Sequence, residues 1–432
     1  MARRAYLPLR GVRVISFETA YSLPAGTRTL SELGAEVVRA TAPGRVLSNY
    51  TTVVDGNALG KPCLGIDLKN REGNALARRL VAQADVVCSN FRPPVMGTLG
   101  LGPADLRRLK PDVIVLQLSG FGTPGPWTDY PAYGPSTEAA GGINYLIGRE
   151  SDPPMRVGSG IFADQLSGRY AALAVIAALA HRRRTGEGRF IDLSMTESVT
   201  HIVGNLMLSA ALHGRPPPRL GNRDAAFAPQ GVYPCRGDDE WVAISVKSDD
   251  CWRTLVDLVA DDRLRAADLT SVAGRQARHD EIDAALGGWT AGFEKLALAT
   301  LLQSRGIAAA PVSKVSDFHF DPHIMARGLL QMVEHRRPVI GYAAHPHPTT
   351  PFVAVGRSRA KLTDIRDLGA DNFSILQRWL GIERAEVRRL HAVGALRAEP
   401  IVVNEALPTP GVPREADFAA RLGLRRANGA RP

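Results

Sequence analysis

Aromatic residues are scarce in this 432-residue sequence, at 6%, and there are only four cysteines. The cysteines form no Cys-x-x-Cys pair, and no histidine cluster has the spacing of metal ligands, so the sequence predicts reduced thiols and no metal site. No dense basic run is interleaved with aromatic residues, so a nucleic-acid partner is not indicated, although the formal net charge is +10. That charge suits an anionic small molecule with phosphate groups.

Long apolar runs are also missing. The basic residues near the N-terminus are not followed by an apolar segment of signal-peptide type, and no stretch is long enough to span a bilayer. We therefore expect a cytoplasmic protein with no membrane partner. No Gly-x-Gly-x-x-Gly follows the first predicted strand, and no Walker motif occurs, so neither a dinucleotide nor a nucleoside triphosphate site is indicated.

Short apolar segments alternate with helical patterns in the first half of the chain. Strands are predicted at 11–17, 34–39, 64–68, 85–88, 112–118 and 190–194. Helices are predicted at 24–33, 70–83, from 106, at 170–180 and at 195–212, with loops at 90–96 and 121–142. Unbroken apolar strands between helices are typical of a parallel sheet covered on both faces, which binds ligands beyond the carboxyl ends of its strands.

Three consecutive prolines at 216–218 mark a predicted domain boundary. We expect a large α/β domain that begins with 1–215, a small α+β domain at 216–330, a return to the large domain at 331–396, and a flexible or wrapping tail at 397–432. The small domain has a predicted hairpin at 231–246 and helices at 252–259, 279–285 and 296–304. In the return, a strand is predicted at 352–355 and helices at 372–380 and 385–392.

Several blocks occur in a characteristic order: GVRVISFETAYSLPAGTRTLSELGAEVVRA at 11–40, KPCLGIDLKNREG at 61–73, ADVVCSNFRPPVMGTLGLG at 84–102, SGFGTPGP at 119–126, RVGSGIFADQLSG at 156–168 and LGADNFSILQRWLG at 368–381. In this order and spacing, the chain resembles the class III CoA-transferases, the family of carnitine CoA-transferase and formyl-CoA transferase, over about residues 8–396. The resemblance implies an α/β fold with an open Rossmann-like large domain built from both chain ends, a smaller α+β domain and an interlocked homodimer.

The resemblance places the family's nucleophile on Asp164. It implies an acyl-CoA donor and a carboxylic acid acceptor as substrates, and contacts to coenzyme A from Ala20, Tyr21, Arg39, Lys61, Asn90, Phe91, Arg92 and Tyr133. A carboxylate would attack the acyl-CoA thioester, and the returning thiolate would form an aspartyl-CoA thioester for the acceptor to attack. Backbone amides at Gly158, Gly160, Gly221 and Asn222 are candidate donors to the developing oxyanions.

Three other interpretations stay open. Asp164 near a helix start is compatible with a simple helix cap. The α-methylacyl-CoA racemases share the fold, but the histidine of their Gly-His-Asp-Ile-Asn-Tyr block falls on Gly141 here, so one proton carrier is missing. A non-catalytic CoA-binding subunit of a heteromeric transferase is the third, and the presence of Asp164 argues against it. Departures from the family pattern at Thr41 and Pro62 leave the donor and acceptor acids undetermined.

Overall fold

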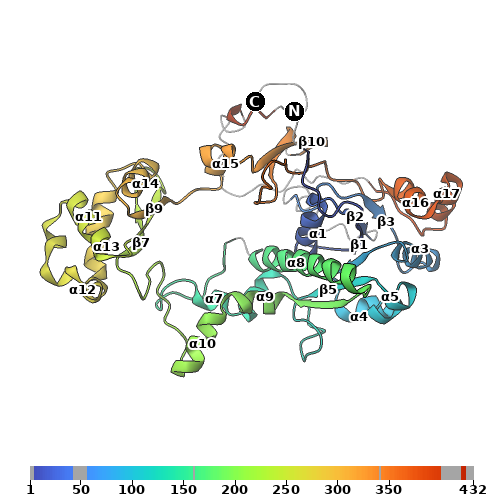
Figure 1. The fold of residues 1–432 in the computed structure, drawn as a ribbon, viewed down its shortest axis with the longest axis horizontal. Helices are drawn as coiled ribbons and strands as arrows, with labels where there is room; N and C mark the ends of the chain where they lie inside the picture. The colour runs from blue at the N-terminus through green and yellow to red at the C-terminus, as the bar shows by residue number, and fades with distance from the viewer. Residues whose placement is uncertain (1–3, 42–55, 159–160, 340–341, 400–419, 425–432) are drawn as a thin grey trace. The chain divides into compact units, whose positions relative to one another are not determined.

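The structure is a computed structural model that describes residues 4–41, 56–158, 161–339, 342–399 and 420–424. The chain divides into two compact units (Figure 1). One contains Met1–Asn144, Arg156–Leu208 and Pro322–Pro432, and the other contains Tyr145–Met155 and Ser209–Asp321. Most of the predicted tail at 397–432 lies outside the described residues. Among the described residues, no helix has both the length and the apolar character needed to cross a membrane.

A six-stranded parallel sheet forms the centre of the first unit, in the order β3-β2-β1-β4-β5-β6. Its strands are β1 (Arg13–Phe17), β2 (Glu36–Thr41), β3 (Cys63–Gly65), β4 (Val86–Ser89), β5 (Ile114–Ser119) and β6 (Phe190–Ser194). The prediction of a parallel α/β sheet is confirmed. The strand order reverses between β1 and β4, and a reversal of this kind opens a crevice beyond the carboxyl ends of the two strands.

Both faces of the sheet are buried because neighbouring residues of each strand point to opposite sides. Val14 and Val86 pack with helices α1 (Ser22–Glu32), α8 (Phe162–Thr185) and α9 (Met195–Ile202). Ile15 and Val87 pack on the other side with α3 (Arg71–Val81), α5 (Pro103–Leu109), α16 (Asn372–Leu380) and α17 (Arg384–Ala392). The first strands and the late helices α16 and α17 thus share one hydrophobic core.

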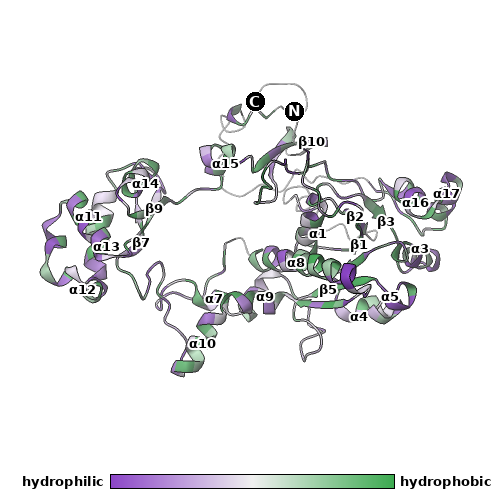
Figure 2. Ribbon diagram, in the orientation of Figure 1, coloured by the Kyte–Doolittle hydropathy of each residue, from purple (hydrophilic) through white to green (hydrophobic). Residues whose placement is uncertain are grey.

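Helix α8 has 24 residues and begins eight residues before the predicted start at 170. It ends at Gly186, whose φ of 75° is left-handed, after three arginines that complement the negative end of the helix dipole. Figure 2 shows this hydrophilic last turn after the more hydrophobic body of the helix. The start was predicted too late because a glycine-rich segment is typical of a loop. Gly168 nevertheless lies inside the helix, at a point where the backbone of α1 approaches closely.

Three further predictions were wrong. The loop expected at 121–142 contains α6 (Gly134–Ala140). Pro135 is tolerated in its first turn because the N–H groups of a first turn have no partner within the helix, so the missing N–H of proline costs nothing there. The loop expected at 90–96 contains the start of α4 (Pro93–Thr98). No strand forms at 352–355, where Val355 is fully exposed; this part of the chain instead has an antiparallel pair, β10 (Leu330–Val339) and β11 (Tyr342–Pro348).

The second unit contains an antiparallel sheet in the order β7-β8-β9, and the hairpin predicted at 231–246 forms its first two strands. The strands are β7 (Gln230–Pro234), β8 (Trp241–Ser245) and β9 (Ala308–Pro311). Helices pack on it around a core that includes Ile244, Leu255 and Ile282. They are α11 (Asp249–Val259), α13 (His279–Thr290) and α14 (Lys295–Ser304). Helix α12 (Val272–Ala277) comes directly before α13 in the chain and contacts it. Among the described residues, the remaining α-helices are α7 (Ile143–Leu146), α10 (Gly204–His213) and α15 (Pro322–Ala326). The helix predicted at 195–212 is interrupted at Val203, between α9 and α10.

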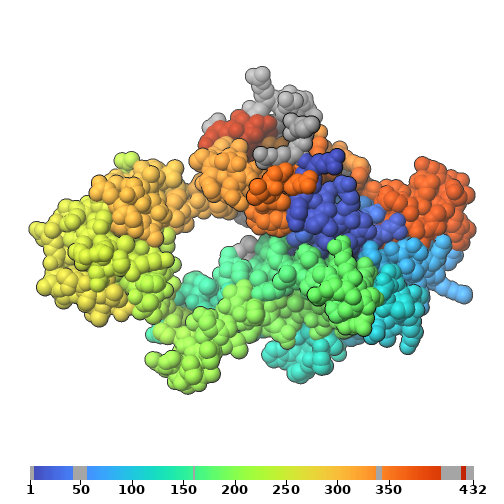
Figure 3. Space-filling view, viewed as in Figure 1, coloured from blue at the N-terminus to red at the C-terminus, as the bar shows by residue number. Residues whose placement is uncertain are grey.

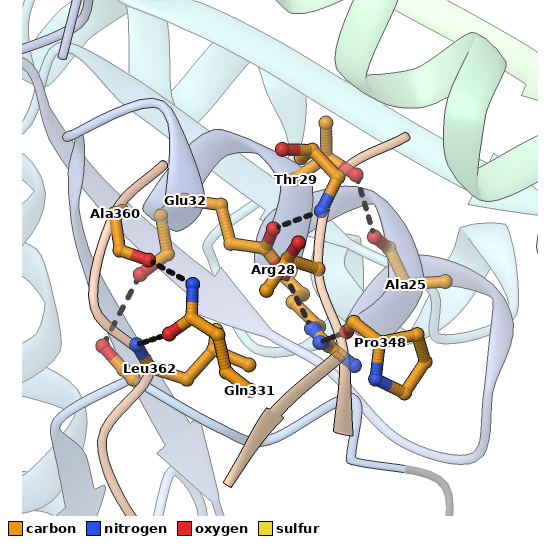
Figure 4. A network of polar contacts seen from close by, with 12 residues as sticks. Ala25, Arg28, Thr29, Glu32, Gln331, Pro348, Ala360 and Leu362 are labelled. Carbon is orange, nitrogen blue, oxygen red and sulfur yellow. Dashed lines mark hydrogen bonds and ion pairs between the residues drawn. The ribbon is translucent and has the colours of Figure 1, made fainter. Parts of the chain in front are cut away.

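The segment that returns to the first unit is tied to α1 by polar contacts (Figure 4). Arg28 donates to the carboxylate of Glu32 at 2.7 Å and to the carbonyl oxygen of Pro348. The amide of Thr350 donates to the other oxygen of Glu32 at 2.6 Å. Gln331 in β10 joins Ala360 and Leu362 by two hydrogen bonds, at 3.0 and 3.1 Å. The contacts of Arg28 and Glu32 hold the returning segment against α1, and those of Gln331 hold it together internally.

Candidate functional site

Asp164 lies in the first turn of α8 and is 6% exposed. Its helix packs tightly against α1: a Cβ atom at Gly168 would lie 2.5 Å from the carbonyl oxygen of Ser22, and one at Gly26 would lie 2.5 Å from the carbonyl oxygen of Gly168. Only glycine permits this approach at either position. Because residues i and i+4 share a helix face, Asp164 lies one turn from the contact with the start of α1.

Glu138 of α6, which we did not predict as a site residue, caps α8. Its Oε1 accepts hydrogen bonds from the amides of Phe162 at 2.9 Å and Ala163 at 3.2 Å. Glu138 is completely buried, and its Oε2 has no hydrogen-bond partner among the described residues. The residue before the helix is Ile161, so the interpretation of Asp164 as the helix cap was wrong. No local pattern could have revealed Glu138, since the amides it binds lie 24 and 25 residues further along the chain.

Burial raises the pKa of Asp164 to about 7, and the negative charge of Glu138 contributes in the same direction. A hydrogen bond from the backbone of Asp164 acts in the opposite direction. A carboxyl group with this pKa is partly protonated and partly ionised at neutral pH. Strong perturbation by burial together with a neighbouring charge is characteristic of functional carboxyl groups, which serve as nucleophiles or proton carriers.

Five predicted coenzyme A contacts gather at the carboxyl ends of β1 and β4: Ala20, Tyr21, Asn90, Phe91 and Arg92. Asn90 accepts from the amide of Thr19 at 2.9 Å and donates to its carbonyl oxygen at 2.7 Å, so it fixes the loop between β1 and α1. Within this loop Ala20 has a φ of 55°, which costs about 1–2 kcal/mol for a residue other than glycine. Strained residues of this kind concentrate at functional sites.

Lys61 lies in a buried polar cluster instead of at the surface. Its ammonium is 2.5 Å from Oε1 of Glu18 and donates to the hydroxyl of Thr27 at 2.9 Å. The second oxygen of Glu18 accepts from the hydroxyls of Ser16 at 2.8 Å and Thr27 at 2.6 Å. Lys61 is 1% exposed, so its ammonium is occupied by this structural ion pair, and its contact with coenzyme A stays a prediction.

The remaining predicted residues are dispersed. Arg39, at the end of β2, donates to the carbonyl oxygen of Arg366 at 3.2 Å and to the sulfur of Cys63 at 3.4 Å. Tyr133 is 68% exposed and lies immediately before α6, the helix that carries Glu138. Gly221 is in the second unit, where its amide donates to the carbonyl oxygen of Gly148 at 2.9 Å. Gly160 lies outside the described residues. In the described part of the chain, no group of three or more metal-ligating side chains is arranged to hold a metal ion.

Comparison of the chain with known proteins identifies its family. A family model described as CoA-transferase family III matches residues 9–357. The chain is 31% identical over 409 residues to the probable CoA-transferase Rv1866 of Mycobacterium tuberculosis, covering 89% of this chain and only 50% of that protein. The chain therefore spans half the length of this relative.

Two further relatives match over most of their own length. The beta subunit of succinyl-CoA–L-malate CoA-transferase from Chloroflexus aurantiacus is 31% identical over 343 residues, covering 76% of this chain and 84% of that protein. Succinate–glutarate CoA-transferase from Agrobacterium fabrum is 30% identical, covering 74% of this chain and 84% of that protein.

Solved structures show the same fold. The structure of a CAIB/BAIF family protein from Brucella suis has a TM-score of 0.77 at 26% identity, covering 87% of this chain and all of that one. The structure of Rv3272 from M. tuberculosis has a TM-score of 0.73 at 26% identity, covering 85% of this chain and 99% of that one.

Proposed function

The chain belongs to CoA-transferase family III, and from this membership we propose that it moves coenzyme A from an acyl-CoA donor to a carboxylic acid acceptor through Asp164. The observation that supports the proposal is the environment of this residue. Asp164 is a buried carboxyl group with a pKa of about 7, in the first turn of a helix packed against the start of α1. Burial limits access of the water that would hydrolyse an acylated carboxylate.

In the proposed reaction, the Asp164 carboxylate attacks the thioester carbonyl carbon. A C–O bond forms, the C–S bond breaks, and the electron pair leaves with the thiolate sulfur, giving a mixed anhydride. The thiolate then attacks the aspartyl carbonyl carbon and releases the donor acid as a carboxylate. The acceptor carboxylate then attacks the carbonyl carbon of the aspartyl-CoA thioester, which releases the thiolate and forms a second anhydride. The thiolate attacks the carbonyl carbon of the acceptor in this anhydride, which forms the new acyl-CoA and frees the Asp164 carboxylate.

The names of the relatives point to a class of acid. Succinyl-CoA–L-malate, succinate–glutarate and succinyl-CoA:mesaconate CoA-transferases are each named for dicarboxylic acids. We extend this to the present chain as a proposal: succinyl-CoA is the donor, and a short dicarboxylic acid is the acceptor. The formal net charge of +10 favours the approach of such anionic substrates.

The direct test is to incubate the full chain with succinyl-CoA in the absence of an acceptor and to measure its intact mass. We expect a covalent coenzyme A adduct that peptide mass spectrometry maps to Asp164 and that hydroxylamine removes. Acetyl-CoA and benzoyl-CoA serve as donors of other acyl classes. Absence of an adduct with all three donors, on a folded protein, would contradict the proposed nucleophile.

The racemase alternative is less compatible with the structure. The histidine of the racemase block corresponds to Gly141, where a Cβ atom would lie 2.6 Å from Cγ1 of Val199. The local packing therefore has no room for a side chain at that position. Exchange of the α-proton of an acyl-CoA for deuterium from the solvent, without transfer of coenzyme A, would favour the racemase.

The alternative of a non-catalytic subunit is kept because relatives from Chloroflexus aurantiacus are named as alpha and beta subunits of one transferase. Formation of the aspartyl adduct by this chain alone would argue against it.

The cytoplasmic location expected from the sequence stays a prediction.

A homodimer, interlocked as in the resembling family, is part of the proposal. Helix α10, which is labelled in Figure 1 and lies at the surface in Figure 3, is apolar, yet none of its residues is buried. Its Leu212 is 74% exposed. We expect sedimentation equilibrium to give twice the chain mass of 46.4 kDa. Leu208→Lys together with Leu212→Lys should shift the protein toward the monomer, whereas Leu296→Lys, at another exposed leucine, should not. A wild-type monomer at all concentrations would refute the dimer.

A further inference from the structure

The two carboxylate oxygens of Glu138 have different surroundings. Oε1 accepts both amide hydrogen bonds at the start of α8, whereas Oε2 is buried without a hydrogen-bond partner among the described residues. Two donated N–H groups and the positive end of the helix dipole stabilise the negative charge of Glu138. One carboxylate oxygen is enough to cap a helix, so capping does not explain why Oε2 is buried without a hydrogen-bond partner.

Glu138 binds the same helix turn that carries the nucleophile. The amides that it binds belong to the two residues that precede Asp164 in the chain, so both carboxyl groups lie at the first turn of α8. Other titratable groups stand on the elements packed against this helix: Arg28 and Glu32 on α1, Asp192 on β6, and Glu197 and His201 on α9. Among the described residues, Glu138 is the one whose charge acts on the carboxyl group of Asp164.

We propose that Glu138 is a positioning residue that destabilises the ionised free nucleophile relative to its acylated form and thereby favours acylation of Asp164. The inference rests on the proposed function. When Asp164 attacks the thioester, its negative charge leaves with the thiolate electron pair, and the anhydride that remains is neutral. Repulsion between two neighbouring carboxylates is present before the step and absent after it. The fixed charge of Glu138 thus lowers the free energy of the step.

The test compares the wild-type protein with Glu138→Gln, which retains an oxygen acceptor for both amides and removes the charge. Glu197→Gln, an exposed carboxylate in the first turn of α9, is the matched control. Two measurements are made between about pH 5 and pH 9. One is labelling of Asp164 by a water-soluble carbodiimide and glycinamide, which requires the protonated carboxyl group. The other is the equilibrium constant for acylation of Asp164, obtained from the fraction of protein that carries coenzyme A as the aspartyl thioester in mixtures of succinyl-CoA and succinate.

In Glu138→Gln, we expect the labelling midpoint to fall by about one pH unit. Above both midpoints, the acylation equilibrium constant should fall by about tenfold, the factor that corresponds to one pH unit. Glu197→Gln should match the wild type in both measurements. Glu138→Asp, which keeps the charge, should have a labelling midpoint closer to that of the wild type than Glu138→Gln does. If the glutamine variant does not fold, Glu138→Asn, which also removes the charge, replaces it and should lower the midpoint in the same direction.

The outcomes separate this inference from the proposed function. Unchanged midpoint and acylation constant in Glu138→Gln would overturn the role of Glu138 even if Asp164 is the nucleophile. A second outcome is a lower labelling midpoint in Glu138→Gln together with no adduct between the wild-type protein and succinyl-CoA. It would support the effect of Glu138 on Asp164 and count against the proposed function.

Discussion

Replacing Asp164 by asparagine is expected to lower the rate of coenzyme A transfer by about 10⁴-fold or more, because an amide cannot form the anhydride or the thioester. The loss should appear in kcat, and the coenzyme A adduct should be absent from the intact mass. Asp262→Asn makes the same chemical change at a fully exposed position of the second unit and should leave transfer unchanged. Substantial transfer by the Asp164→Asn protein would show that another group is the nucleophile.

The same variant should fold at least as stably as the wild type, which separates loss of chemistry from loss of structure. The pKa of Asp164 is raised from 3.8 to about 7, so the folded state holds this proton more tightly than the unfolded chain does. The stability that protonation provides is therefore lost as the pH rises through about 7. Asparagine avoids that loss.

Thermal unfolding at two pH values measures this difference. Near pH 4, Asp164 is protonated in the folded state, and the two proteins should be about equally stable. Near pH 8, Asp164→Asn should be more stable than the wild type by about 1–4 kcal/mol in the free energy of unfolding. A variant that is less stable at the higher pH would show that the carboxylate is better solvated than its burial indicates.

Replacing Lys61 by methionine is expected to lower the free energy of unfolding by about 3–5 kcal/mol, because the carboxylate of Glu18 would stay buried without its cation. Urea unfolding measures the loss. Lys69→Met, at an exposed lysine eight residues away, should change stability by less than about 0.5 kcal/mol. Equal effects of the two substitutions would mean that the ion pair contributes nothing to the fold.

A double variant, Glu18→Gln with Lys61→Met, also tests the predicted role of Lys61 in binding. Removing both charges should recover much of the lost stability, since no uncompensated charge stays buried. If Lys61 has only a structural role, the double variant should bind coenzyme A as the wild type does. Weak binding by a stable double variant would instead support the predicted contact.

Local patterns predicted many of the elements well. The strand expected at 190–194 and the helix expected at 372–380 have the observed bounds of β6 and α16. Both depend on the period of apolar residues and on nearby turn residues, which are properties of a short segment. The predictions were wrong where glycine and proline occur inside helices, at α6 and at the start of α8. At α6 the proline lies in the first turn, where its missing N–H needs no helical partner. In α8, close packing of one backbone on another requires glycine inside the helix.

The sequence by itself determined the α/β class, the parallel strands of the sheet and the family, because apolar periodicity and ordered motifs are properties of the chain alone. It also singled out Asp164 by resemblance. Only the tertiary structure brought Glu138 to the start of α8 and enclosed Lys61 with Glu18. Partners that lie 24 and 43 residues apart in the chain leave no local pattern, since their contact depends on how separate helices and strands pack. The charge around Asp164 is therefore a property of the fold.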